Sequence, residues 1–599
     1  MDLPPFHDVI LSAIWKNSQN GAICFKSAEN RWPDVPYAEL YNAILSCAKT
    51  FRQLGIKKND VVTIALHNTW HYFPCYFGAA CVGAISSGMS PEYTPFEMSY
   101  QLFNSETKVL LISSSLLPKI AKLIKELPKL EIILYLGAVP SCEQFSPIKL
   151  INFKSILAEE PVFDRTALKV NVKDDIFGLP YSSGTTGLPK GVMITHFNML
   201  SHMLFLSQHY AVHVTPIFPE LAGESMKVTV SFLPYYHAYG FTAVCGHLLG
   251  GTTVVIMEHF NYESLLGCVQ EYKIGHLSMV PMLFNYLVHS PLVDRYDLSS
   301  IKSLSCGGAP LSSHMIEQVK KRLPSLLFVM QGYGMTEMVS ASHMTVFDEP
   351  TPPNAIGKLI DGMQHKVVDP ETGKVLPPGE VGEICVKGPT VMKGYWRNDG
   401  ENAMAIDGDG FLRTGDVGYI DEHDFLYLKD RFKELIKVKA FQVAPAELEH
   451  LLLTHPEISD AAVIGIPHET VGEAPRAFIV PNSPSLTAQE VLDFVKERVS
   501  SYKQLIGGVQ FVGQTPNQSR LPQIFGFQLQ VLNPTKTPVQ NVKHFFCRNS
   551  WRETWRSFCL ILSSRNLLSI FYPNFINFSS WIHQLYNSLF PIICRRIQK

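Results

Sequence analysis

The sequence predicts an α/β protein with a large N-terminal domain of helix-covered parallel sheets plus a β subdomain, and a small mobile α+β C-terminal domain. Three observations lead to this prediction. The chain has 599 residues, more than one hydrophobic core usually serves. Its hydrophobic fraction of 46% supplies enough apolar side chains for a large buried core. Short β-branched or aliphatic runs alternate with longer segments of helical spacing, an order typical of parallel sheets.

Seven short apolar runs are expected to form strands of these sheets. They lie at 61–66, 109–113, 132–136, 176–181, 228–233, 252–257 and 327–330. In open α/β folds, ligands bind where the carboxyl ends of parallel strands meet their loops. Glycine-rich segments follow the runs at 176–181 and 327–330, so we expect a ligand site beside these two strands.

The pattern changes between residues 377 and 430. Short strands are punctuated there by Pro-Pro-Gly, Asp-Gly-Asp-Gly and Glu-His-Asp turns. Such closely spaced turn signals indicate a smaller, hairpin-rich β subdomain.

A compact α+β segment follows this subdomain. Pro445 suits the first turn of a helix, and a strand is expected at 461–466. Thr487 and Glu490 have the spacing of a capping box, which predicts a second helix that ends near Ser500. The expected divisions of the chain are residues 1–430, residues 431–512 and an atypical tail, 513–599.

The tail differs sharply in composition from the rest of the chain. Residues 513–599 contain no alanine or aspartate and carry ten Lys or Arg against the single acidic Glu553. Residues 566–594 lack charged side chains and are rich in Phe, Ile and Leu. Two interpretations stay open: a segment that contacts a membrane, or an alternative or mis-spliced reading of the gene.

The charge and cysteine content limit which partners the protein can bind and in which cell compartment it is expected. With 51 basic and 53 acidic side chains, the chain has no overall charge that would attract nucleic acid. Twelve cysteines occur without a C-x-x-C pair, and the N-terminus lacks the basic and then apolar layout of a signal peptide. A cytoplasmic protein is expected, because the last residues, Arg596-Ile-Gln-Lys599, are not a Ser-Lys-Leu peroxisomal signal.

A hydroxyl- and glycine-rich run, Tyr181-Ser-Ser-Gly-Thr-Thr-Gly-Leu-Pro-Lys-Gly191, is expected to grip phosphate. Its glycines let amide N–H groups converge on an anion. Its hydroxyls and one lysine add donors and charge, and the residues concerned are Ser182, Ser183, Gly184, Thr185, Thr186, Gly187 and Lys190. The run is not a Walker loop, because Pro189 and Gly191 replace the second glycine and the Ser or Thr of that motif.

This run and several later motifs resemble those of the adenylate-forming acyl-CoA synthetases, a family similar to plant 4-coumarate–CoA ligases and firefly luciferase. The resemblance covers roughly residues 20–512. The later motifs are Leu233-Pro-Tyr-Tyr-His-Ala-Tyr-Gly240, Gly307-Gly-Ala-Pro310, Gln331-Gly-Tyr-Gly-Met-Thr-Glu337, Thr414-Gly-Asp416 and the segment 430–447. The resemblance implies that ATP, Mg²⁺ and coenzyme A are used to convert a carboxylic acid to its acyl-CoA, with a small domain that rotates about a hinge at Lys433.

The resemblance also assigns roles to residues of the adenylation step. Lys190 contacts the departing phosphates, while Thr336 and Glu337 contact phosphate and magnesium. His237 lies near the reacting carboxylate, although a histidine among aromatic residues is more often structural. The nucleotide is framed by Gly308, Ala309, Pro310, Gln331, Gly332, Tyr333, Asp416 and Arg431. For Asp416 and Arg431, a structural salt bridge is the alternative.

The resemblance also suggests residues that bind the carboxylic acid and residues that act in the step with the CoA thiol. The substrate-pocket candidates are Tyr239, Phe241, Gly334, Met335 and Val339, and they suit an aryl-propenoate or a medium-to-long fatty acid equally. The thiol step is assigned to the segment that contains Lys437, Lys439, Ala440 and Gln442. Ala440 stands where the family usually has glycine, which puts this step in doubt.

The last motif of the family is absent. This motif has the form Pro-Lys-x-x-x-Gly-Lys, and its final lysine bridges the carboxylate and the α-phosphate. The chain instead reads Thr515-Pro-Asn-Gln-Ser-Arg-Leu-Pro522, with proline at the place of that lysine. Two functions therefore stay open: a working acid–CoA ligase, or a catalytically impaired protein that binds nucleotide and acyl groups.

Overall fold

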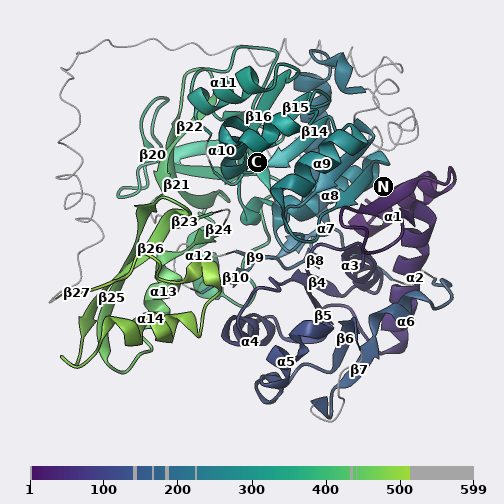
Figure 1. Ribbon diagram of the computed structural model, residues 1–599, viewed down its shortest axis with the longest axis horizontal. Helices are drawn as coiled ribbons and strands as arrows, with labels where there is room; N and C mark the ends of the chain where they lie inside the picture. Colours follow the sequence, from purple (N-terminus) through teal and green to yellow (C-terminus); the bar gives the residue numbers. More distant parts are fainter. Residues whose placement is uncertain are drawn as a thin grey trace.

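The computed structural model describes residues 3–138, 145–164, 168–182, 188–222, 226–309, 311–431, 436–439 and 441–512. Figure 1 shows a large N-terminal domain of sheets and helices and a smaller C-terminal domain, drawn in green to yellow. The predicted fold class is confirmed. The predicted tail, 513–599, lies outside the described residues.

A seven-stranded sheet lies in the N-terminal part of the chain, in the order β11-β8-β4-β3-β5-β6-β7. Its strands are β3 (Val61–Ala65), β4 (Ile85–Gly88), β5 (Thr107–Ser113), β6 (Ile132–Leu136), β7 (Lys149–Asn152), β8 (Ile176–Gly178) and β11 (Ile194–Thr195). All pairs are parallel except β11 with β8. Every residue of β3 is buried, as expected when helices cover both faces of a sheet.

A four-stranded sheet brings the start of the chain against residues about 200 positions away. Its order is β12-β13-β1-β2, with β1 (Ile23–Ser27), β2 (Val35–Pro36), β12 (Val228–Ser231) and β13 (Thr253–Ile256). The pairs β12–β13 and β1–β13 are parallel. The apolar runs predicted near 228 and 252 are therefore confirmed as neighbouring strands.

The third large sheet has nine strands and differs from the expected subdomain. It comprises β14 (His276–Met279), β15 (Ser303–Cys306), β16 (Phe328–Gly334), β17 (Ala341–Met344), β18 (Gly357–Leu359), β22 (Phe425–Arg431), β21 (Leu412–Ile420), β20 (Gly382–Lys387) and β19 (Gln364–Val368), in this spatial order. The pairs β14–β15 and β15–β16 are parallel, and the others are antiparallel. The hairpin-rich strands thus continue the parallel strands, because a tight turn after β16 sends the chain back as β17.

The helices of the N-terminal part fill the spaces around these sheets. They are α1 (Phe6–Ser18), α2 (Tyr37–Gln53), α3 (Tyr72–Cys81), α4 (Pro95–Asn104), α5 (Leu117–Ala121), α6 (Phe153–Leu157), α7 (His196–His209), α8 (Ala238–Gly250), α9 (Tyr262–Tyr272), α10 (Pro281–His289), α11 (Ser313–Arg322) and α12 (Asp399–Ala405). In the ranges that the structure describes, none of the helices is both long and apolar enough to span a bilayer.

The C-terminal domain has its own sheet and core. The sheet contains β24 (Phe441–Val443), β23 (Ile436–Val438), β26 (Gly472–Pro481) and β25 (Ile458–His468) in this order, with β27 (Val509–Phe511) also paired to β26. Helices α13 (Pro445–Leu452) and α14 (Ala488–Lys496) pack on it. The Thr487–Glu490 capping box is present, but α14 ends at Lys496, earlier than the expected Ser500. We propose that the domain boundary follows residue 430, at the end of β22.

Candidate active site

The expected phosphate loop is the tip of a small hairpin. Strand β9 (Tyr181–Ser182) pairs with β10 (Lys190–Gly191), and Ser182 lies opposite Lys190. The expected residues Ser183, Gly184, Thr185, Thr186 and Gly187 lie outside the described residues. The hairpin therefore places the first hydroxyl of the run and its lysine side by side at the base of the loop.

Lys190 is held by a carboxylate from a helix that the sequence did not predict. Its Nζ lies 2.6 Å from Glu401 Oε2, on α12, and 5.1 Å from the centre of the Tyr395 ring. The Lys190 side chain is only 9% exposed. The cation is thus positioned and largely desolvated before any phosphate approaches, which strengthens its attraction for an anion.

Glu337 lies against the base of the loop. It belongs to a 3₁₀ turn, η8 (Thr336–Met338), and its Oε1 accepts hydrogen bonds from Ser182 Oγ at 2.7 Å and Tyr395 Oη at 2.9 Å. Among the described residues, no group of three His, Cys, Asp or Glu could hold a metal ion. A magnesium ion fits this arrangement only if Glu337 is one ligand and phosphate and water oxygens supply the rest, as is usual for Mg²⁺.

The turn that carries Thr336 and Glu337 requires an unusual backbone. A Cβ atom at Gly334 would lie 1.5 Å from the Ser340 carbonyl oxygen, so only glycine fits. Val339 has φ +71° and ψ −54°, a conformation that β-branched residues rarely adopt. Strain of this kind concentrates at functional sites. The close return of the chain explains how Glu337 reaches Ser182.

Two residues expected to frame the nucleotide contact each other directly. The Tyr333 hydroxyl donates a hydrogen bond of 2.7 Å to Asp416 Oδ2, and both side chains are buried. Asp416 and Arg431 are opposite residues of the β21–β22 pair, although the Arg431 side chain is not among those described. Strands β16, β21 and β22 therefore bring three residues that are distant in sequence to one place.

Gln331 has a structural contact. Its side-chain oxygen accepts a hydrogen bond of 2.9 Å from the Leu311 backbone N–H, which ties β16 to the segment that follows Gly308 and Ala309. Gly308 has φ +82°, a left-handed conformation that glycine adopts without strain. Pro310 lies outside the described residues. The Gln331 side chain thus fixes the position of the segment expected to face adenine.

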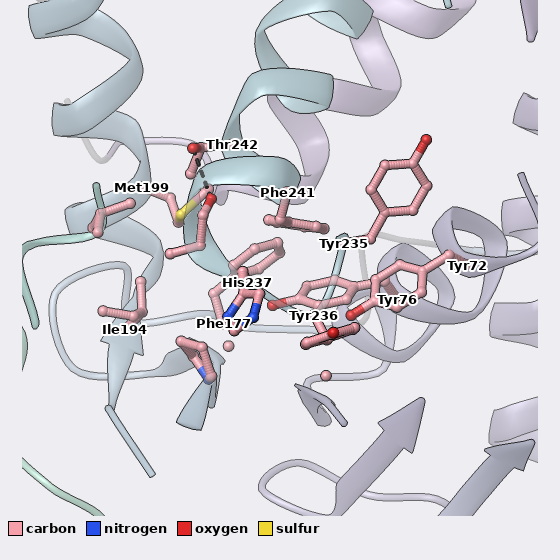
Figure 2. Close-up of a pocket in the computed structure, with 15 residues that line it drawn as sticks. Tyr72, Tyr76, Phe177, Ile194, Met199, Tyr235, Tyr236, His237, Phe241 and Thr242 are labelled. Carbon is pink, nitrogen blue, oxygen red and sulfur yellow. Dashed lines mark hydrogen bonds between the residues drawn. The ribbon is translucent and has the colours of Figure 1, made fainter. Parts of the chain in front are cut away.

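His237 stands at the edge of an aromatic cavity. The cavity leaves about 30 Å³ for the centre of a water-sized sphere. Figure 2 shows rings from α3, β8 and the start of α8 around it, namely Tyr72, Tyr76, Phe177 and Phe241. His237 lies beside it with part of its surface open to solvent, but the protein packed around the ring still limits its hydration and lowers the pKa of the imidazole to about 4. The imidazole is therefore neutral near pH 7.

The five expected substrate-pocket residues do not all meet at this cavity. Phe241 and Val339 line it, whereas Tyr239, Gly334 and Met335 do not. The Tyr239 hydroxyl lies 3.3 Å from Ser305 Oγ on β15 instead. Burial raises the pKa of Tyr239, so its hydroxyl keeps its proton.

Polar side chains continue from Ser305 across neighbouring strands. Ser305 Oγ lies 3.1 Å from Ser278 Oγ and 3.3 Å from His276 Nε2, both on β14. His276 Nδ1 is 2.8 Å from Ser303 Oγ. Because alternate residues of a strand share a face, these side chains form one polar stripe that begins at Tyr239. We call Tyr239, His276, Ser278, Ser303 and Ser305 the polar stripe.

The expected thiol-step segment forms the β23–β24 hairpin. Lys437 is exposed on β23, and its backbone N–H donates to Glu473 Oε2 at 2.7 Å. Lys439 has φ +55°, so the left-handed residue of the hairpin precedes Ala440. Gln442 lies opposite Lys437 in the β23–β24 pair, although its side chain is not among those described. Ala440 and the expected hinge residue Lys433 lie outside the described residues.

Sequence reasoning missed several residues of this region. Glu401 and Tyr395 position Lys190 and Glu337, and His276 and Ser278 belong to the polar stripe. No local motif marks Glu401 or Tyr395. The sequence offered one signal for the polar stripe: His276 and Ser278 alternate with Leu277 and Met279.

Known protein families match the sequence in both domains. The AMP-binding enzyme family matches residues 14–396, and the C-terminal domain of AMP-binding enzymes matches residues 447–520. The chain is 34% identical to acyl-CoA synthetase 7 of Caenorhabditis elegans, over 85% of this chain and 93% of that protein. It is 38% identical to 4-coumarate–CoA ligase 1 of Petroselinum crispum, over 78% of this chain and 84% of that protein.

A solved structure extends the similarity to the fold. The long-chain-fatty-acid-CoA ligase of Archaeoglobus fulgidus is similar with a TM-score of 0.67 and 27% identity, over 85% of this chain and 98% of that one. Both family domains occur in the expected order. The chain therefore belongs to the AMP-binding enzyme family of adenylate-forming acid–CoA ligases.

Proposed function

We propose that this protein uses ATP to activate a carboxylic acid as an acyl adenylate and then passes the acyl group to coenzyme A. The acid's carboxylate attacks the α-phosphate and pyrophosphate leaves; the CoA thiol then attacks the acyl carbonyl and AMP leaves. The proposal rests on two contacts at the base of the loop: Ser182 lies opposite Lys190 in the hairpin, and its hydroxyl donates a hydrogen bond to Glu337. Two anions must approach in the first step, and a positioned cation offsets their repulsion.

The roles follow from chemistry and position. Lys190 holds the departing phosphates, and Glu337 would supply a carboxylate to a magnesium ion, which would offset phosphate charge when bound. Asp416 accepts hydrogen bonds from the ribose hydroxyls, because an ionised carboxylate offers two acceptor oxygens. His237, neutral at pH 7, orients the acid's carboxylate without adding charge.

We propose further that the acid is a hydroxylated aryl-propenoate. The polar stripe supports this choice, because its hydroxyl and imidazole groups hydrogen-bond mainly to one another and, apart from the buried Ser303, are only partly buried. An alkyl chain laid along the polar stripe would cover these groups without pairing them, which is costly. A phenolic hydroxyl would exchange hydrogen bonds with them.

The test compares acids on the purified chain. ATP, magnesium and CoA are supplied with 4-hydroxycinnamate, cinnamate or decanoate, and acyl-AMP and acyl-CoA are measured by mass spectrometry. We expect 4-hydroxycinnamate to be preferred, and Ser305→Ala to lower its preference over cinnamate by about tenfold, the effect of one lost hydrogen bond. Ser300→Ala, whose hydroxyl bonds the Ile274 carbonyl outside the polar stripe, is the control. A native preference for decanoate would contradict the substrate proposal.

A second candidate is a protein that binds nucleotide and acyl groups without efficient catalysis. The observation in its favour is the absence of a lysine anywhere between Lys503 and Lys536, where the family's last motif belongs. ATP binding with neither acyl-AMP nor acyl-CoA formed from any acid would support this candidate over the ligase.

A further inference from the structure

One buried lysine joins the two domains. Lys503, in a 3₁₀ turn before β27, places its Nζ 2.7 Å from Glu97 Oε1 on α4 and 2.7 Å from Glu447 Oε1 on α13. The three side chains are 4%, 6% and 7% exposed, respectively. A charge this deeply buried is stable only when it is paired. Lys503 therefore depends on a carboxylate that lies 406 residues away in the sequence.

Each carboxylate lies in the first turn of its helix. Glu97 closes a capping box with Thr94, accepting from the Thr94 backbone N–H at 2.9 Å. Glu447 occupies the corresponding turn of α13, after Pro445. Negative side chains are favoured at helix N-termini, so both are already positioned before they meet Lys503. The lysine thus bridges the N-terminal turns of two helices, one from each domain.

Neighbouring hydrogen bonds strengthen the same contact. Ser500 Oγ donates to Glu97 Oε2 at 2.7 Å, and Thr94 Oγ1 donates to the Arg498 carbonyl at 2.7 Å. We call Thr94, Glu97, Glu447, Ser500 and Lys503 the Lys503 cluster. Because hydrogen bonds to ionised groups are the stronger ones, the Lys503 cluster is well suited to hold one domain against the other.

The Lys503 cluster lies beside the candidate site. The ring of Tyr502 stacks on Phe441 of the β23–β24 hairpin, with centroids 4.1 Å apart. Lys503 Nζ is 5.1 Å from the centre of the Tyr93 ring. Ser500 Oγ also lies 3.4 Å from the Glu92 carbonyl oxygen, and a Cβ at Gly88 would lie 2.7 Å from Tyr236 Cα. The segment from Gly88 to Glu92 therefore lies between the Lys503 cluster and the residue preceding His237.

We propose that Lys503 is a positioning residue of the thiol step: by bridging Glu97 and Glu447, it docks the C-terminal domain with the Lys437–Gln442 hairpin beside the His237 motif. This inference rests on the proposed function for its catalytic part. Removing the ammonium leaves two buried carboxylates facing each other, and separating the domains is the direct way to hydrate them. Lys503 variants should therefore undock the domain and leave its own fold intact.

The first experiment needs no activity. Hydrogen exchange of the full chain is compared for the native protein, Lys503→Met and Glu97→Gln, with Lys496→Met as the control, because Lys496 is an exposed lysine of the same domain. We expect exchange at residues 92–98 and 498–503 to rise at least tenfold in the first two variants, with β25 and β26 still protected. Unchanged exchange at 92–98, or an equal rise throughout the C-terminal domain, would overturn the proposal.

The second experiment separates the two half-reactions. Purified 4-hydroxycinnamoyl adenylate and CoA are mixed with each variant in a single turnover, and pyrophosphate exchange with ATP is measured separately. We expect Lys503→Met to slow thioester formation at least tenfold without slowing exchange, and Lys503→Arg to restore part of the rate. Slower exchange with normal thioester formation would overturn the assignment to the thiol step. Native inactivity in both assays would refute the proposed function, while the exchange experiment still decides the docking.

Discussion

At the scale of single residues, Lys190 shows how a charge can be expected from sequence while its environment cannot. The lysine ends the glycine-rich run, and this position alone suggested a phosphate contact. Its partner Glu401 lies on α12, a helix inside a segment expected to contain only strands and turns. The ion pair means that phosphate must compete with a carboxylate for the same ammonium.

This competition leads to a prediction about nucleotide affinity. Lys190→Ala removes a charge-assisted contact and should weaken binding of ATP with magnesium by about 10- to 100-fold, the usual range for a hydrogen bond to a charged group. Glu401→Gln should strengthen binding, because it removes the competitor. Titration calorimetry measures both.

The control for this experiment is Lys366→Ala. Lys366 Nζ lies 2.6 Å from Asp407 Oδ2, a similar and partly buried pair on β19. Its loss should leave ATP affinity unchanged. Equal affinities for the native chain and Lys190→Ala would exclude the phosphate role of Lys190.

At the scale of elements, the turn between β16 and β17 determines the position of Glu337. A side chain at Gly334 meets the backbone of Ser340, whereas at Gly332 the nearest atom to an added Cβ is 3.7 Å away. These glycines occupy the same strand and the same face. They form a matched pair for testing how much the turn contributes.

We expect Gly334→Ala to lower the free energy of unfolding by about 3 kcal/mol, because overpacking against backbone cannot be relieved by side-chain rotation. Gly332→Ala should change it by less than about 1 kcal/mol. Thermal unfolding of the two variants tests this, and equal melting temperatures would show that the turn adapts.

Element prediction from the sequence succeeded where burial alone decides the pattern. The run at 132–136 is β6 without any change of bounds, because strands covered on both faces are continuously apolar. The prediction failed where contacts with neighbouring strands decide which sheet a strand joins. Nothing local indicated that β17 and β18 would join the parallel strands β14 to β16 to the expected β subdomain in one sheet.

At the scale of the whole molecule, we predict that the residues beyond 512 limit the adenylation step. The last family motif is replaced there by Thr515-Pro-Asn-Gln-Ser-Arg-Leu-Pro522. A hybrid that carries a relative's complete C-terminus should form acyl-AMP about 10²- to 10³-fold faster, the usual effect of one positioned charge. Pyrophosphate release measures this step. A hybrid no faster than the native chain would show that the missing motif is not limiting.

The stability of the folded chain should also depend on pH. The Lys503 cluster contains two carboxylates for one ammonium, packed against Tyr93 and Tyr502, and burial raises the pKa of Glu447 above its ordinary 4.5. The folded chain therefore binds a proton at Glu447 more tightly than the unfolded chain does. The stability that this proton contributes is fully present below pH 4.5 and is lost as pH rises through the raised pKa.

Chemical denaturation tests this dependence. The free energy of unfolding should fall as pH rises through that range in the native chain. In Glu447→Gln, which cannot ionise, this fall should be absent. The same pH response in both proteins would assign the dependence to another group.

The sequence by itself determined the family and predicted which segments serve phosphate, ribose and thiol, because motifs and apolar periodicity are local properties of a chain. Only the tertiary structure decided which side chains meet: Lys190 with Glu401, Tyr333 with Asp416, and Lys503 with Glu97. These contacts join residues far apart in the sequence, and their partners are chosen by packing and by the cost of leaving a buried charge unpaired.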